Sequence, residues 1–332
     1  MMVKYAALFL LCLCSGCSEN YVKEENRYKK CDDTKDFQEI CRRIRGMDVV
    51  VVSPGSGVAT QFASYLKKSN FNIPDTSLIN HDVFGSSDTD DHRLNHFIDA
   101  VNSDHKIIWA LRGGFGAARL IASLDRLPKP CVAKTFIGFS DITSLNLFIS
   151  QKWPNWRVIH ATVFAYLDKK SSKNKFGTLL DILGGKIDSY DINNLHHLNE
   201  KAKTQKDIIG KLTGGNLTII ENSLKTCWEI QTDGKIVFIE DVREEPQCIY
   251  RTMYHLKEVG KLSGAKALIF GCFNGVSDQK KVLLYLKGFA KTLDIPVYAT
   301  NQFGHGDYNV PLIYNATAKI RGGKMTISVP HS

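Results

Sequence analysis

Apolar runs and amphipathic stretches alternate along residues 48–161, and this alternation predicts the fold of that part of the chain. Short apolar runs lie at residues 48–52, 106–111, 135–137 and 157–161. Stretches with helical spacing separate them at residues 58–68, 117–124 and 142–153, and another helix is expected to start at Ser87–Asp90. Strands that alternate with helices predict a parallel sheet covered on both faces. We therefore expect an α/β domain over residues 47–165.

The chain becomes polar and rich in Lys and Asn from about residue 164 to residue 206, which predicts a connector over residues 166–206. A second domain is expected over residues 207–330. Its pattern predicts strands at residues 235–239, 265–270, 296–297 and 317–329 and helices at residues 250–259 and 282–293. The total of 332 residues is enough for two domains of ordinary size, and the hydrophobic share of 43% is that of a globular protein.

The first 17 residues have the pattern of an export signal. Lys4 gives a short positive region, residues 6–14 form an apolar core, and Ser15-Gly16-Cys17 is similar to a bacterial lipoprotein cleavage site. We expect an exported, periplasmic protein whose residues 18–46 form a polar tether. Lipidation of Cys17, an ordinary cleaved signal peptide and a retained anchor are the alternatives. If the segment does not work as a signal, the protein is cytoplasmic.

The cysteines do not alter the expected fold or function. Nine are present. The six that follow Cys17 in the chain contain no paired C-x-x-C spacing, so a zinc site is not expected. In an oxidising periplasm Cys31 and Cys41 could form a disulfide. The remaining cysteines of the mature chain are expected to be small buried apolar residues; they are Cys131, Cys227, Cys248 and Cys272.

The charges favour a soluble basic surface. Lys and Arg exceed Asp and Glu by 43 to 34, which gives a net charge of +9 that is spread along the chain. No nucleic-acid motif accompanies this excess, so we expect no nucleic-acid partner, although an anionic polymer such as a cell wall would be attracted. The acidic cluster at residues 88–92 could suggest a metal site. Acids in a first helical turn are expected from the helix dipole alone, and we expect no metal there.

The apolar run at residues 135–137 ends in Gly138-Phe139-Ser140-Asp141, and the helix at residues 142–153 follows. A serine at such a strand-to-helix turn is typical of a nucleophile, because the turn exposes the hydroxyl and directs backbone N–H groups at the group it attacks. A simple helix N-cap is the alternative. The glycine-rich turn at residues 112–116 follows the neighbouring strand. Active sites of parallel sheets lie at the carboxyl ends of the strands, where both turns are expected.

A nucleophilic serine needs a base and an acid that orients the base. His305 stands in a turn with glycine on both sides, which would expose its ring. Glu240 ends the apolar run at residues 236–239, where a carboxylate could hold an imidazole. A surface histidine and a surface charge at the end of a strand are the alternative interpretations.

Five short segments then resemble one family. In order they are residues 112–116, 138–143, 213–217, 239–241 with Glu244 and Arg251, and 303–305. Together they resemble the L,D-carboxypeptidase family of serine peptidases, which includes the microcin C immunity branch. The resemblance extends over residues 48–328.

The resemblance implies a flavodoxin-like N-terminal domain, a smaller β-rich C-terminal domain, a homodimer and no metal or cofactor. It implies that Ser140 is the nucleophile, Glu240 the acid and His305 the base. The backbone N–H groups of Gly114 and Asp141 would form the oxyanion hole. Two further residues are candidates for substrate binding, namely Arg112 and Asn216; Arg112 could equally belong to a structural ion pair.

The expected function is a serine L,D-carboxypeptidase that releases the terminal D-alanine from peptidoglycan tetrapeptides. One alternative is an exported lipoprotein that binds muropeptides without turnover. Another is a hydrolase of aminoacyl-nucleotide antibiotics, as in the microcin immunity branch.

Overall fold

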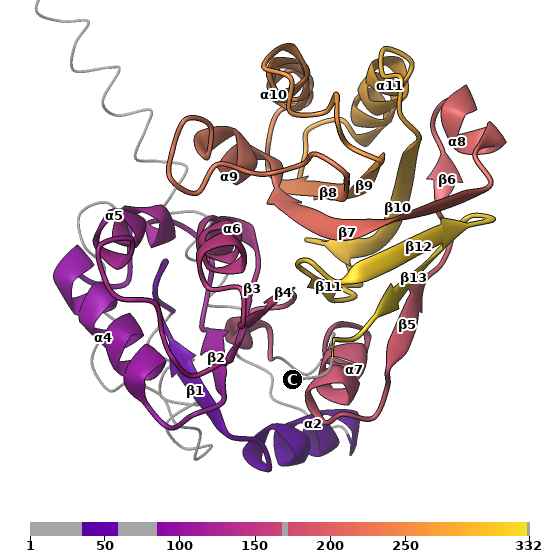
Figure 1. Cartoon of the computed structure of the whole chain (residues 1–332). Coiled ribbons are helices and arrows are strands. Elements are labelled where there is room, and N and C mark those ends of the chain that lie inside the picture. Colours follow the sequence, from indigo (N-terminus) through magenta and orange to yellow (C-terminus); the bar gives the residue numbers. More distant parts are fainter. Residues whose placement is uncertain (1–34, 59–84, 168–171, 331–332) are drawn as a thin grey trace, which may run out of the picture.

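The computed structural model describes residues 35–58, 85–167 and 172–330 (Figure 1). The predicted signal segment, residues 18–34 of the tether and nearly all of the predicted helix at residues 58–68 lie outside these ranges. The described residues form two sheets, one of five strands and one of eight. Within the described residues, no helix has both the length and the apolar character needed to cross a membrane.

The smaller sheet has the order β1-β2-β3-β4-β11. Its parallel strands are β1 (Val49–Val52), β2 (Ile107–Ala110), β3 (Thr135–Gly138) and β4 (Arg157–His160). All residues of β2 and β3 are buried, which explains why these strands appear in the sequence as continuous apolar runs. The predicted strands of this half are therefore confirmed.

Helices pack around this sheet. They are α4 (Asp90–Asn102), the short pair η1 (Ala117–Leu120) and α5 (Ile121–Leu124), and α6 (Thr143–Lys152). The predicted start of α4 is confirmed, because the Thr89 hydroxyl caps the helix by accepting the His92 N–H at 3.4 Å. Eight of the ten residues of α6 are buried, so α6 is a core helix with apolar and small polar residues on all sides.

The larger sheet has the order β5-β13-β12-β7-β8-β9-β10-β6. Its parallel centre consists of β7 (Asp207–Asn216), β8 (Lys235–Val242), β9 (Ala267–Asn274) and β10 (Val297–Gly304). The antiparallel pair β12 (Thr317–Arg321) and β13 (Lys324–Ser328) extends it beside β7. Three helices lie along one side of the sheet in Figure 1, namely α9 (Leu217–Asn222), α10 (Pro246–Glu258) and α11 (Gln279–Ala290).

The expected connector at residues 166–206 is wrong, because this segment supplies both edges of the larger sheet. β5 (Ser189–Ile192) pairs with β13, and β6 (His196–His197) pairs with β10. The helices α7 (Ser172–Leu183) and α8 (Glu200–Thr204) belong to the same segment. Edge strands are half exposed, so their polar composition hid them from a search for apolar runs.

The expected tether is also partly folded. α2 (Lys35–Arg45) buries Phe37, Ile40 and Ile44 against the core. The Arg43 guanidinium lies 2.7 Å from the Asp181 carboxylate, which joins α2 to α7. The apolar residues stand at helical spacing within a polar sequence, so only one face of the helix is buried.

One strand from the C-terminal half completes the smaller sheet. β11 (Leu312–Ile313) runs antiparallel to β4, with Leu312 opposite His160 (Figure 1). The Tyr314 N–H then bonds the Val158 carbonyl at 2.9 Å. The segment just after His305 is therefore built into the N-terminal half.

The cysteines differ from expectation. Cys131 and Cys227 are exposed in loops, whereas Cys248 in the first turn of α10 and Cys272 in β9 are half-buried. Cys41 is buried, and Cys31 lies outside the described residues, so their pairing stays a prediction.

Candidate active site

Ser140 stands on a strained turn between β3 and α6. Its φ angle is +63°, a left-handed conformation that a non-glycine residue rarely adopts. A Cβ on Gly138 would lie 2.5 Å from Cγ2 of Ile142, so only glycine allows the chain to bend here. A Cβ on Gly113 would lie 2.9 Å from the Ser140 Cβ. The loop after β2 therefore lies directly against the serine.

Glu240 and His305 meet at the carboxyl ends of β8 and β10. His305 Nδ1 lies 2.5 Å from Glu240 Oε2. The Glu240 side chain is completely buried, whereas the His305 side chain keeps 8% of its surface exposed. The β8–β9 pairing shifts register between Ile239 and Asp241, and such a bulge redirects the side chain within it. This geometry suits a carboxylate that holds a largely buried imidazole in a fixed orientation.

The other oxygen of Glu240 faces a second imidazole. Oε1 lies 3.9 Å from Nε2 of His160, and both side chains are completely buried. Burial alone would raise the pKa of Glu240, but the charge and hydrogen bond of His305 hold it below its ordinary value. Burial lowers the pKa of His160 to about 4, although Glu240 acts in the opposite direction. At neutral pH Glu240 is therefore charged and His160 is neutral.

Phe139 brings the histidine to the serine turn. Its ring centroid lies 4.5 Å from that of His305 and 5.8 Å from that of His160. Phe139 immediately precedes Ser140, so the His305 ring packs against the residue next to the serine. The structure therefore joins Glu240 to His305 by a hydrogen bond, and joins His305 to the serine turn through Phe139.

The two expected oxyanion donors lie in the loops around Ser140. Gly114 has a φ of +86° and packs so closely on Ser56 that a Cβ would lie 2.3 Å from the Ser56 hydroxyl oxygen. The Asp141 carboxylate is turned inward and accepts the Ala117 N–H at 2.9 Å. Burial raises the pKa of Asp141 to about 6. Within the described residues, the N–H groups of Gly114 and Asp141 donate no hydrogen bond.

Arg112 and Asn216 are used for structure. One Arg112 nitrogen donates to the Gly57 carbonyl at 2.9 Å, which holds the loop after β1. The Asn216 side chain caps α9 by accepting the Ile219 N–H at 3.2 Å and donates to Asp241 at 2.7 Å. Asn216 is only 4% exposed. We therefore treat Asn216 as a residue that positions the end of β7 rather than as a substrate contact.

The acidic cluster at residues 88–92 contains the partner of a buried arginine that the sequence did not single out. Arg93 is 1% exposed; it donates to the carbonyls of Pro54 and Gly116 and pairs with Asp90. Arg119 lies 2.9 Å from the other oxygen of Asp90. The described residues contain no group of three or more His, Cys, Asp or Glu that could hold a metal ion.

His160 is the other residue that sequence reasoning missed. The available signal was a histidine at the end of an apolar strand, the same signal that identified Glu240. It escaped notice because its partner lies 80 residues later in the sequence, on β8.

Comparisons with known proteins cover both halves of the chain. Residues 49–161 match the model of the LD-carboxypeptidase N-terminal domain, and residues 209–320 match that of the C-terminal domain. A Rickettsia conorii protein that carries the provisional name of a carboxypeptidase is 42% identical over 282 residues, covering 83% of this chain and 89% of that protein. The chain belongs to the LD-carboxypeptidase family. The resemblance inferred from five short segments is thus confirmed.

Other proteins that the chain resembles have more specific names. The murein tetrapeptide carboxypeptidase of Pseudomonas aeruginosa is 28% identical over 239 residues, covering 67% of this chain and 74% of that protein. Among solved structures, the muramoyltetrapeptide carboxypeptidase of Oxalobacter formigenes superposes with a TM-score of 0.71 at 23% identity, covering 85% of this chain and 98% of that chain. The microcin C7 self immunity protein MccF superposes with a TM-score of 0.70 at 17% identity, covering 84% and 95%. The expected two-domain α/β fold is confirmed.

Proposed function

We propose that this LD-carboxypeptidase family member is a serine enzyme that releases the terminal D-alanine from peptidoglycan tetrapeptides. The observation that carries the proposal is the 2.5 Å contact between His305 Nδ1 and the buried Glu240, with the His305 ring packed beside the Ser140 turn. A nucleophile, a base and an orienting acid are the minimum set for this chemistry.

In the first half-reaction, His305 Nε2 takes the proton of Ser140 as the serine oxygen attacks the carbonyl carbon before D-alanine. Glu240 holds the Nδ1–H tautomer and stabilises the imidazolium. The N–H groups of Gly114 and Asp141 receive the oxyanion, a contribution of roughly 3–4 kcal/mol per donor in comparable sites. The C–N bond then breaks, His305 gives its proton to the leaving amine, and the peptide remains as an ester on Ser140.

In the second half-reaction, water attacks the ester. His305 takes a proton from the water as its oxygen bonds to the carbonyl carbon, and the same two N–H groups receive the oxyanion again. The bond to Ser140 then breaks and His305 returns the proton to the serine oxygen. The products are a tripeptide with a free carboxylate and D-alanine.

We favour a murein peptide over an aminoacyl nucleotide as the substrate. The relative that carries a murein tetrapeptide name matches this chain in sequence, at 28% identity. The microcin immunity protein matches it at 17%, a level at which only the fold is shared. The tetrapeptide is therefore the substrate to test first.

Export, lipidation of Cys17 and a homodimer also belong to the proposal. The export signal lies in residues 1–17, outside the described ranges. Metabolic labelling with a palmitate analogue tests the anchor: the label should be present on the full chain and absent from Cys17→Ser. Light scattering at several concentrations tests the dimer, and a constant monomer mass would exclude it.

Ser140→Ala should abolish turnover of disaccharide-tetrapeptide, with a loss of at least about a thousandfold in kcat, because the serine is the group that carries the acyl intermediate. Mass spectrometry would follow the loss of one alanine. Ser263→Ala, at an exposed serine, is the matched control and should keep full activity. Turnover that persists in Ser140→Ala would refute the proposal. A wild-type protein that binds the substrate without releasing alanine would identify a binding protein instead.

A further inference from the structure

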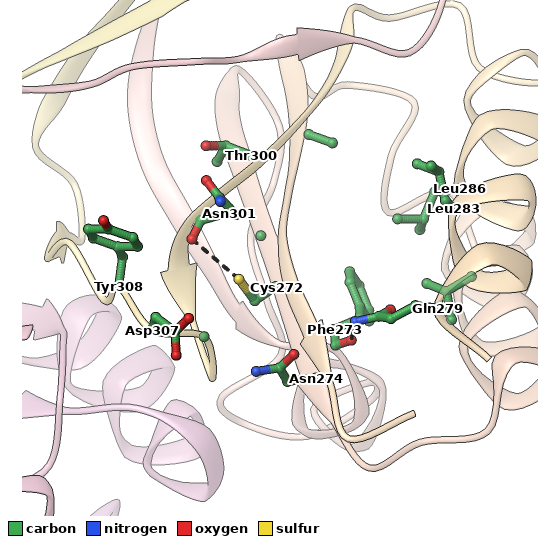
Figure 2. A pocket seen from close by; sticks show the side chains of 14 residues that line it. Cys272, Phe273, Asn274, Gln279, Leu283, Leu286, Thr300, Asn301, Asp307 and Tyr308 are labelled. Carbon is green, nitrogen blue, oxygen red and sulfur yellow. Dashed lines mark hydrogen bonds between the residues drawn. The ribbon is translucent and has the colours of Figure 1, made fainter. Parts of the chain in front are cut away.

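A pocket of about 340 Å³ lies beside the His305 loop, between the ends of β9 and β10 and helix α11 (Figure 2). The residues used below are its apolar wall, Leu283 and Leu286, and its polar wall, Asn274, Asn301, Asp307 and Tyr308. The two walls face each other in Figure 2, with the leucines on α11 and Asp307 and Tyr308 on the opposite side. A pocket of this size is within the range of small-molecule sites.

The polar wall has unused hydrogen-bonding groups. Within the described residues, the side chains of Asn301, Asp307 and Tyr308 make no hydrogen bond or ion pair. Tyr308 is 44% exposed, so its ring is available to a ligand. An amide, a carboxylate and a phenol together offer donors and acceptors to hydroxyl and amide groups, and an exposed ring packs against an apolar face.

The charge of the pocket restricts its ligand. No Lys or Arg is found among the described lining residues, and Asp307 adds a negative group. A phosphate or another anion would therefore lie unpaired beside a carboxylate, which is unfavourable. A neutral ligand with several hydroxyls, an amide and a small apolar group fits both walls. An N-acetylated hexose has all of these features.

The pocket is close to the catalytic histidine. Asn274 donates its side-chain N–H to the His305 carbonyl at 2.9 Å, and Asp307 and Tyr308 stand two and three residues after His305 in the chain. Tyr308 therefore lies within about 11 Å of His305, the span of three extended residues. In a tetrapeptide cleaved before its last residue, three residues separate the scissile bond from the sugar, which is a similar distance.

We propose that this pocket binds the N-acetylhexosamine to which the peptide of the substrate is attached. The inference rests on the proposed function for its substrate. Peptides that carry the sugar would then bind more tightly than free peptides, because the sugar contacts the pocket. The pocket would set a preference for glycan-bearing muropeptides over tetrapeptides without sugar.

The test compares two substrates in each protein. We would measure kcat/KM of the full chain on disaccharide-tetrapeptide and on the same tetrapeptide without sugar. In Tyr308→Ala, the ratio of kcat/KM with sugar to kcat/KM without sugar should fall about tenfold, the effect expected of one lost ring contact. In Asn301→Ala it should fall by up to about tenfold, the effect expected of one lost hydrogen bond. Tyr254→Ala removes an exposed tyrosine of α10 outside the pocket and should keep the wild-type ratio. An unchanged ratio in Tyr308→Ala would overturn the inference.

A binding measurement keeps this result separate from the proposed function. N-Acetylglucosamine would be titrated into Ser140→Ala protein while the side-chain amide signals of Asn274 and Asn301 are followed by NMR. Saturable shifts that disappear in Tyr308→Ala would support the pocket even if the wild type released no alanine. Absence of any shift at saturating sugar would overturn the inference even if the wild type proved to be a carboxypeptidase.

Discussion

At the scale of single residues, the candidate site depends on groups held in unusual states. Ser140 keeps a left-handed backbone, and Glu240 keeps its charge although it is completely buried. Each state is maintained by neighbours, Gly138 in the first case and His305 in the second. Two predictions follow from the buried carboxylate and its two imidazoles.

Glu240→Gln should lower kcat by roughly a thousand- to ten-thousandfold, because a neutral amide neither holds the Nδ1–H tautomer nor stabilises the imidazolium. KM should change little, since Glu240 is buried away from the substrate. Steady-state kinetics on the tetrapeptide would measure both. Glu258→Gln, at the exposed end of α10, is the control. A kcat within tenfold of wild type would remove Glu240 from the proposed triad.

His160 should make the protein less stable in acid. Its pKa is lowered to about 4 in the fold, whereas an unfolded histidine has its ordinary value of 6.5. The unfolded chain therefore binds the proton first, and stability present above pH 6.5 is lost as the pH falls towards 4. The expected loss is roughly 3 kcal/mol. Urea unfolding at several pH values should show this loss of unfolding free energy in the wild type and not in His160→Gln. Parallel pH dependences in the two proteins would contradict it.

At the scale of elements, glycines decide how closely strands and helices approach one another. Gly138 lets β3 turn into the helix that follows Ser140. Gly304, with a φ of +95°, lets the end of β10 pass Glu240, where a Cβ would lie 2.8 Å from the Glu240 Cβ. The site therefore depends on small residues as well as on the side chains that carry the proposed chemistry.

Gly138→Ala should destabilise the fold by about 1–3 kcal/mol, because the new methyl group collides with Ile142 and Ala110. It should also lower kcat/KM by more than tenfold, because Ser140 moves with the turn. A tenfold loss corresponds to about 1.4 kcal/mol of activation free energy. Gly288→Ala is the matched control. Gly288 lies in α11 with open space around it, so this change should stabilise the protein by about 0.5–1 kcal/mol. Denaturant unfolding of both variants would test the opposite signs.

At the scale of the whole molecule, the two halves are not independent. β11 follows the His305 loop and pairs with β4 of the smaller sheet. His160 on β4 faces Glu240 on β8, and a Cβ on Gly215 of β7 would meet the Thr143 side chain at the start of α6. The machinery proposed here is therefore assembled by the contact between the halves.

The two halves should unfold in a single transition, because β11 joins one to the other. Tryptophan fluorescence reports mainly the first half, where Trp109, Trp153 and Trp156 lie, whereas far-UV circular dichroism reports both. The two probes should give one midpoint. Leu312→Ala should lower the free energy of unfolding by about 2–5 kcal/mol for both probes. Leu284→Ala, at an exposed leucine, should change it by less than about 0.5 kcal/mol. Two separate transitions in the wild type would contradict this view.

The parallel core and the turns that carry the candidate chemistry could be predicted from the amino-acid sequence. Strands buried on both faces must be continuous apolar runs, so β1 to β4 and β8 were visible. The glycine-flanked turns at Ser140 and His305 were visible because local backbone geometry demands small residues there. The family followed from the order of those turns.

Features that depend on partners distant in the chain became visible only in the folded molecule. The polar edge strands β5 and β6 became strands because β13 and β10 offered them hydrogen bonds. In the acidic cluster, Asp90 pairs with Arg93. The Asn216 side chain donates a hydrogen bond to Asp241. His160 became relevant only when folding buried it 3.9 Å from Glu240. Local pattern cannot encode such pairs, because their energies arise from burial and charge across separate elements.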